Sequence, residues 1–289
     1  MSNHHPILNT ICLLLSILLI TACTQQPPAM TTKQASTQAS PPSHSSLTTK
    51  EKPQIFEFTY HHFKENENVK ASAVTRDIHK FEADLQYLKA QGYNNVTHKQ
   101  IIDHFDKGAP LPEKPYAIRF DDGYLSNYTL AFPIIKKYNA KVAICIIGVS
   151  VGVHENITPH FSWQQAREMV DSGLISIQNH SYDLHKIDGS GVGQFEGESL
   201  EDYKTRLRTD FTKLNDLIYQ NVGNKPYLFA YPNGVVNDTA EQIARECGFT
   251  FTTARPNILS TERDYDKYNL TRLDFFSYTK VDELIKTAQ

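Results

Sequence analysis

The sequence has 289 residues, of which 29 are basic and 32 acidic, so its formal net charge is −3. Such balanced charge offers no basic footprint for nucleic acid. Hydrophobic residues make up 40% of the chain, which is enough to bury a full core. The composition therefore favours a folded globular protein whose partners are not nucleic acids.

The N-terminal segment indicates export and a lipid anchor. Residues 11–20, ICLLLSILLI, form an apolar run that is too short for a transmembrane helix but typical of a signal peptide. The run leads into ITAC at 20–23, which resembles the lipobox of bacterial lipoproteins, where the cysteine carries a diacylglycerol. The alternative is an ordinary secretion signal with an incidental cysteine, and the first ten residues lack Lys and Arg. We expect a signal peptide over 1–22, a lipid on Cys23, and anchoring at the cell surface or the periplasmic face of a membrane.

The segment that follows is a tether. Residues 23–52 are rich in Ser, Thr, Gln and Pro and contain almost nothing to bury, so this stretch cannot offset its ordering entropy. Residues 53–289 then form one domain, and we expect that domain to be monomeric. Within it, Cys145 and Cys247 could form a disulfide outside the cytoplasm or remain free thiols.

Strands and helices alternate along this domain. The hydrophobic pattern predicts strands over 55–60, 116–120, 142–148, 174–178, 227–231, 249–253 and 268–275. Helices are predicted over 76–90, 130–138, 163–170, 198–220, 240–246 and 280–287, with a proline that kinks or starts a segment inside 130–138. Repeated βα units imply a parallel sheet covered by helices. We therefore predict an α/β fold, a distorted (β/α) barrel of about seven parallel strands.

Polar side chains follow four of the predicted strands. His61 follows the first strand, Asp121 and Asp122 follow 116–120, His180 follows 174–178, and the sequence PNG follows 227–231. In a barrel of this kind the carboxyl ends of the strands meet on one face, where the chemistry gathers. The sequence therefore predicts a site on that face.

Two short motifs supply the candidate chemistry. Asp-Asp-Gly at 121–123 is by itself typical of a turn, and the histidines of NHSYDLH at 179–185 could decorate a surface loop. Together, however, two histidines and one aspartate are a recurrent ligand set for a divalent metal with an open position. The second carboxylate is then available to act on a water molecule.

The combination resembles a known family. FDDG at 120–123, then His180 and His185, then a strand ending in YPNG at 231–234, is similar to the polysaccharide deacetylases of carbohydrate esterase family 4. The pair Tyr60-His61, the sequence DLH at 183–185 and the sequence AYPNG at 230–234 resemble, more narrowly, the deacetylases of poly-β-1,6-N-acetylglucosamine in biofilms. The resemblance covers residues 55–275 and implies a distorted barrel.

This resemblance implies a role for each matching residue. Asp122, His180 and His185 would bind the metal, zinc by default, although cobalt, nickel or iron also suits such a set. Asp121 would be the general base and His61 the general acid, with His62 pointing the other way. The backbone N–H of Asn233 would stabilise the oxyanion, and Tyr231 would contact substrate.

The chain also departs from the family pattern. Many relatives carry an arginine at the position of Ala230 that orients the catalytic aspartate, and here Arg272 is the candidate for that role. Asn233 replaces a tyrosine, and Arg119 stands where threonine is common. We expect Trp163 in the core and His98, His104, His154 and His160 at the surface.

The sequence thus predicts a metal-dependent N-deacetylase acting on an extracellular N-acetylglucosamine polymer, with poly-β-1,6-N-acetylglucosamine favoured. Peptidoglycan, chitin or xylan is the alternative substrate. An alternative of another class is a non-catalytic glycan-binding barrel with a structural metal. The presence of Asp121 argues against this last hypothesis, because a structural site needs no spare base.

Overall fold

Parallel strands form one curved sheet in the computed structural model, which describes residues 54–65, 74–155, 158–186, 188, 190–254, 270–275 and 279–288. Neighbouring strands follow the order β10-β1-β5-β6-β7-β8-β9, and β4 pairs with the start of β5. The strands are β1 (Ile55–Tyr60), β4 (Asn94–Asn95), β5 (Pro115–Asp122), β6 (Val142–Ile146), β7 (Ile175–Asn179), β8 (Leu228–Ala230), β9 (Phe251–Thr253) and β10 (Leu270–Asp274). The prediction of an α/β fold with a curved sheet of about seven parallel strands is confirmed.

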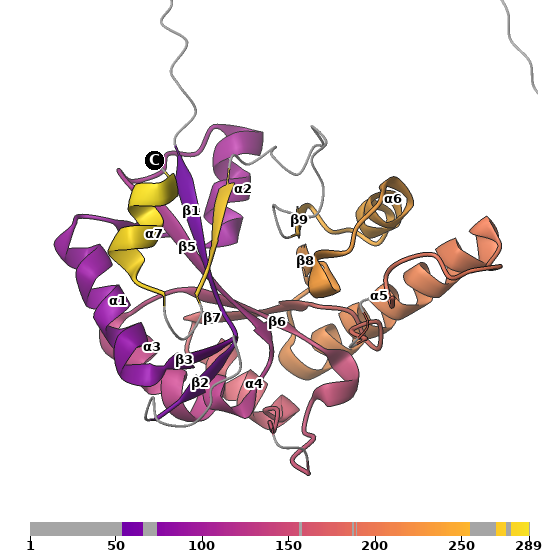
Figure 1. The fold of residues 1–289 in the computed structure, drawn as a ribbon, viewed down its shortest axis with the longest axis horizontal. Coiled ribbons are helices and arrows are strands. Elements are labelled where there is room, and N and C mark those ends of the chain that lie inside the picture. The colour runs from indigo at the N-terminus through magenta and orange to yellow at the C-terminus, as the bar shows by residue number, and fades with distance from the viewer. Residues whose placement is uncertain are drawn as a thin grey trace, which may run out of the picture. The chain divides into compact units, whose positions relative to one another are not determined.

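Helices cover the outer face of this sheet. In Figure 1, α1 and α7 lie on one flank and α5 and α6 on the opposite flank. The helices are α1 (Ile78–Ala90), α2 (His98–Lys107), α3 (Phe132–Tyr138), α4 (Trp163–Asp171), α5 (Leu200–Val222), α6 (Asp238–Glu246) and α7 (Val281–Ala288). Among the described residues, no helix combines the length and the apolar character needed to cross a bilayer.

Local signals in the sequence explain several helix boundaries. Thr97 and Ser162 each form a capping box with a glutamine three residues later, which satisfies free N–H groups at the starts of α2 and α4. Pro133 lies in the first turn of α3, directly after a π-helical turn over Asn127–Ala131. The proline therefore starts a new segment, one of the two outcomes predicted.

Some elements were not predicted. Helix α2 follows the Thr97 cap, and two short strands, β2 (His62–Lys64) and β3 (Thr75–Asp77), pair only with each other. Strands of three residues carry too little periodicity to be recognised in a sequence. The predictions for the signal peptide, Cys23 and the tether concern residues outside the described part of the chain.

The two faces of the strands differ in chemistry. On β1, alternate residues Phe56, Phe58 and Tyr60 join the large apolar cluster beneath the helices. The intervening Glu57 and Thr59 face the inside of the barrel, where both contact Arg119 of β5. Both faces of β1 are therefore buried, as is typical of a parallel strand with helices on one face and the barrel interior on the other.

The inside of the barrel is apolar at one end and charged toward the other. Ile55, Leu228 and Phe251, the first residues of their strands, cluster with Ile101 and Ile102 of α2. Helix α2 thus packs across the amino ends of the strands and leaves the carboxyl ends accessible. Cys145 is buried and Cys247 partly buried, and both are free thiols.

Candidate active site

The carboxyl ends of the strands surround a cavity of about 190 Å³. Register aligns these ends, because Asp122 of β5 pairs with Ile146 of β6, and Ile146 pairs with Asn179 of β7. The residues lining the cavity are His61, Val74, Asp121, Asp122, Tyr124, His180, His185, Tyr231, Asn233, Gly234 and Arg272. Within the described chain, every site residue named from the sequence therefore lies around this cavity.

Asp122, His180 and His185 converge on one point. The Nε2 atom of His180 lies 3.4 Å from Oδ1 of Asp122, and the Nε2 atom of His185 lies 3.5 Å from the same oxygen. The candidate ligand atoms of all three residues lie within 4.8 Å of one another. The five-residue spacing of the histidines is thus accommodated by a loop after β7.

This arrangement fits a divalent metal. Oδ1 of Asp122 is buried and has no hydrogen-bond partner among the described residues, and such a carboxylate oxygen is costly unless a cation or donor meets it. Nδ1 of His180 lies 2.7 Å from the carbonyl oxygen of Ala230, a contact that leaves Nε2 for the metal. Two imidazoles and one carboxylate are ligands that zinc accepts, with a coordination position left open.

The protonation states also suit a metal. Burial raises the pKa of Asp122, but the neighbouring imidazoles of His180, His61 and His185 outweigh it and hold that pKa well below its usual range. Burial and the neighbouring His180 lower the pKa of His185. An ionised carboxylate and a neutral imidazole are the forms that bind metal.

Helix α5 anchors the histidine loop. Asp210 accepts hydrogen bonds from the backbone N–H groups of Tyr182 and Asp183, at 2.7 and 2.8 Å. The side chain of Asn179 donates to the carbonyl oxygen of Phe211 and accepts from the N–H of Ser181. These bonds fix the path of the chain between the two histidines.

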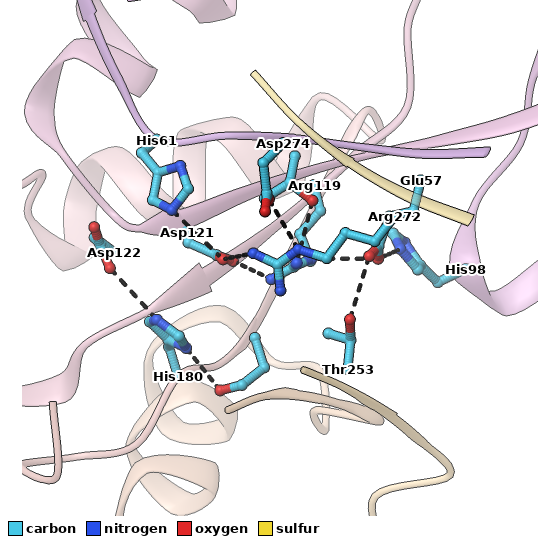
Figure 2. Close-up of polar contacts among 12 residues, drawn as sticks. Glu57, His61, His98, Arg119, Asp121, Asp122, His180, Thr253, Arg272 and Asp274 are labelled. Carbon is cyan, nitrogen blue, oxygen red and sulfur yellow. Dashed lines mark hydrogen bonds and ion pairs between the residues drawn. The ribbon is translucent and has the colours of Figure 1, made fainter. Parts of the chain in front are cut away.

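Asp121 has one fixed and one available carboxylate oxygen. Its Oδ1 accepts a hydrogen bond from Nη1 of Arg119, whereas Oδ2 lies 3.7 Å from Nη2 of Arg272 and 3.9 Å from Nε2 of His61 (Figure 2). Burial raises the pKa of Asp121, but Arg119 and other positive or polar neighbours outweigh it, so the pKa lies below its ordinary value. The carboxylate is therefore ionised at neutral pH.

His61 lies beside this free oxygen. It directly follows β1, is buried, and its Nδ1 atom has no hydrogen-bond partner within the described chain. Burial lowers the pKa of His61, with Asp122 and Asp121 opposing the change. Next along the chain, His62 points elsewhere, because its Nδ1 atom lies 2.9 Å from Oγ of Ser126.

The turn after β8 closes the cavity. Asn233 adopts a left-handed backbone with φ of 55° and donates from its side-chain amide to the carbonyl oxygen of Lys186. Tyr231 lines the cavity, but its hydroxyl donates to Glu241 at 2.8 Å. The tyrosine ring packs against Phe229, with ring centroids 4.9 Å apart, in the apolar cluster that includes residues of α6.

Strained backbone is concentrated at this site. Of the five non-glycine residues with positive φ in the described chain, Asp122, Ser181 and Asn233 belong to the loops just described, with φ of 74°, 69° and 55°. Such conformations cost about 1–3 kcal/mol each and persist where the surrounding structure enforces them. Their clustering supports a functional site.

Two expectations about histidines are wrong. His98 is buried, with Nε2 2.7 Å from Glu57, and His160 is buried against the ring of Tyr124. Tyr124 itself lines the cavity and was not singled out from the sequence. Nothing in the local sequence around His98 indicates that Glu57, 41 positions earlier, lies within hydrogen-bonding distance.

Comparison with known proteins agrees with this geometry. Residues 108–252 match the model of the family described as polysaccharide deacetylase. The chain is 31% identical over 194 residues to YxkH of Bacillus subtilis, covering 67% of this chain and 63% of that protein. It is 27% identical over 189 residues to the poly-beta-1,6-N-acetyl-D-glucosamine N-deacetylase of Escherichia coli K12, covering 56% of this chain but only 28% of the relative.

A solved structure is similar over most of the fold. The de-N-acetylase of Aggregatibacter actinomycetemcomitans superposes with a TM-score of 0.68 at 26% identity, over 81% of this chain and 99% of that one. The fold and the family match thus define a class of hydrolases built on a half-barrel of parallel strands. This chain belongs to the polysaccharide deacetylase family, carbohydrate esterase family 4.

Proposed function

We propose that this protein is a metal-dependent N-deacetylase of an N-acetylglucosamine polysaccharide. The observation that carries the proposal is the meeting of Asp122, His180 and His185 at one point, beside a second carboxylate with a free oxygen. A purely structural metal site would need no such second carboxylate. A glycan-binding barrel without activity therefore leaves Asp121 unexplained.

The residues divide the chemistry between them. Asp122, His180 and His185 would hold the cation, which when bound polarises the acetamide carbonyl and lowers the pKa of a water molecule. Oδ2 of Asp121 faces the cavity as an ionised oxygen and accepts the proton of the attacking water. Hydrolysis of the acetamide then yields acetate and a free amine on the sugar.

His61 completes the proton transfer. Its Nε2 atom lies 3.9 Å from Oδ2 of Asp121, so a proton taken up by the carboxylate is close to the imidazole. His61 would protonate the departing sugar nitrogen as general acid. The turn at Asn233 lies on the cavity wall, where its backbone N–H is our candidate to stabilise the oxyanion.

For the substrate we favour poly-β-1,6-N-acetylglucosamine. Support comes from the relatives of Escherichia coli and Staphylococcus epidermidis that are named as deacetylases of this polymer, the latter 26% identical over 194 residues. Peptidoglycan, chitin and acetylated xylan are the alternative substrates. They differ from the favoured polymer in linkage or in the sugar that carries the acetyl group, which an assay can distinguish.

The test is acetate release from β-1,6-linked and β-1,4-linked N-acetylglucosamine oligomers, with added zinc and with a chelator. We expect release from the β-1,6 oligomers, faster than from the β-1,4 oligomers, and its loss when the metal is removed. Release that is unaffected by the chelator would refute the metal assignment. No release from any acetylated glycan, with the oligomers still bound, would favour the glycan-binding alternative.

Asp121→Asn is the matched variant, because it keeps the shape of the side chain and removes the base. We expect turnover to fall by about 10²- to 10⁴-fold. Zinc should still bind, since none of the three ligands is changed. Turnover within a few-fold of the parent protein would exclude Asp121 as the base.

A further inference from the structure

A chain of buried charged side chains runs through the inside of the barrel to Asp121. His98 of α2 lies 2.7 Å from Oε1 of Glu57, and the same oxygen accepts from Nε of Arg119 at 3.2 Å. Arg119 in turn donates to Oδ1 of Asp121 (Figure 2). All four residues are at most 2% exposed, so water competes little for these contacts.

Arg119 is held on three sides. Besides its bonds to Glu57 and Asp121, its Nη2 atom donates to Oγ1 of Thr59 at 3.2 Å. A planar guanidinium with three separate partners has one orientation available, which a flexible ammonium would not have. The arginine therefore acts as a rigid connection between β1 and the end of β5.

This connection determines which oxygen of Asp121 faces the cavity. Because Oδ1 is engaged by Arg119, Oδ2 is the oxygen left beside His61. Arg272, the orienting residue expected from the sequence, is 3.7 Å from Oδ2, and its Nε donates to Asp274 at 2.8 Å. Arg119, which stands where related sequences commonly have threonine, therefore makes the tighter contact with Asp121.

Glu57 bonds to Arg119 on the side away from Asp121. It is 1% exposed and contacts His98, Arg119 and, through Oε2, the hydroxyl of Thr253 at 3.3 Å. Without Glu57, Asp121 would be the only carboxylate bonded to the buried guanidinium of Arg119. With Glu57 present, Arg119 lies between two carboxylates, one on each side.

We propose that Arg119, held in place by Glu57, is the positioning residue that orients the carboxylate of Asp121 for catalysis. The inference deepens the proposed function and rests on it. Neither residue touches the substrate cavity, so both act through Asp121. The competing explanation is that Glu57 and Arg119 form an ion pair that only stabilises the barrel.

The experiment compares Arg119→Gln with the paired variant Glu57→Gln/Arg119→Gln. The single variant leaves Glu57 without its arginine partner and can fail to fold, whereas the pair replaces both charges with neutral side chains that can bond to each other. We expect the paired variant to melt near the parent protein and to bind zinc within about twofold. Its kcat should be about 10- to 100-fold lower with KM little changed, because orientation and not binding is lost.

A second buried pair serves as the control. Arg76 contacts Asp84 at 2.7 Å, and both are nearly inaccessible, but their further contacts include Tyr60 and Thr279 and not Asp121. The paired variant Arg76→Gln/Asp84→Asn should keep the parental kcat. An equal loss of kcat in both paired variants would show a general effect of neutralising buried ion pairs and would overturn the positioning role.

The outcomes separate the two proposals. A parent protein that releases no acetate refutes the proposed function, whereas an active parent with parental kcat in Glu57→Gln/Arg119→Gln refutes only the positioning role. Crystal structures of the parent and paired variant give a readout that is independent of activity. We expect the Asp121 carboxylate to rotate and Oδ2 to move from its place beside His61, and an unmoved carboxylate would also overturn the proposal.

Discussion

At the scale of single residues, the site is defined by a contrast between two adjacent carboxylates. Asp122 presents an oxygen with no hydrogen-bond partner in the described structure, whereas Asp121 has one oxygen fixed by Arg119 and one beside His61. Both are buried and both have a lowered pKa, because positive or polar neighbours outweigh burial. The two carboxylates are chemically alike, so the roles proposed for them differ only because their neighbours differ.

His185 is the most exposed of the three candidate ligands, with a side chain 25% accessible. We expect His185→Ala to weaken zinc binding by well over tenfold while the fold is retained, because one of three protein ligands is removed from a loop. Competition with a chromogenic chelator measures the affinity. His79→Ala, at an exposed position on α1, is the control, and equal affinities in the two variants would exclude His185 as a ligand.

At the scale of elements, the turn after β5 requires glycine. Gly123 has φ of 85°, and a Cβ atom placed there would lie 2.9 Å from Cγ2 of Ile146 on the neighbouring strand. Two constraints therefore act on Gly123, which has a positive φ and lies against the backbone and side chain of Ile146 in β6. These constraints hold Asp121 and Asp122 at the end of β5.

Gly123→Ala should therefore destabilise the fold more than a substitution at an open left-handed glycine. Gly92 is the matched position, with φ of 74° and no heavy atom within 4 Å of the place that a Cβ atom would occupy. We expect Gly92→Ala to cost about 1 kcal/mol and Gly123→Ala about 2–3 kcal/mol. Chemical denaturation measures both. Equal losses would mean that the contact with Ile146 relaxes without cost.

At the scale of the whole molecule, burial of histidines links stability to pH. Burial lowers the pKa of His61, His62, His160 and His185, and for His62 it acts with Lys64 and His160 to give a pKa of about 4. The unfolded chain takes up these protons near pH 6.5, before the folded chain does. The stability that these lowered pKa values contribute is therefore fully present above pH 6.5 and is lost as the pH falls below it, for His62 down to a pH of about 4.

We expect the metal-free protein to lose thermal stability between pH 7 and pH 5, by roughly 2–4 °C in Tm for each kcal/mol lost. Other buried groups also titrate, so the informative quantity is the difference between variants. His62→Gln should reduce the dependence on pH, whereas His79→Gln at the surface should not. A parental pH dependence in His62→Gln would contradict the low pKa of His62.

The sequence by itself determined the alternation of elements and the place of the site. Continuous apolar runs and turn residues are local signals, and polar residues directly after strands must meet at one face of a parallel barrel. The predictions of the fold and of the family are confirmed, and the structure brings Asp121, Asp122, His180, His185 and His61 around one cavity. The roles assigned to these residues remain predictions.

Only the tertiary structure decided what surrounds them. Arg119 reaches Glu57 across 62 positions, His98 reaches the same carboxylate across 41, and Asp210 anchors the histidine loop from 27 and 28 positions away. Such contacts have no periodic signature, because they depend on which strands become neighbours and on which faces they bury. A surface histidine and a buried one look alike in a sequence. His98 is buried because α2 packs across the barrel.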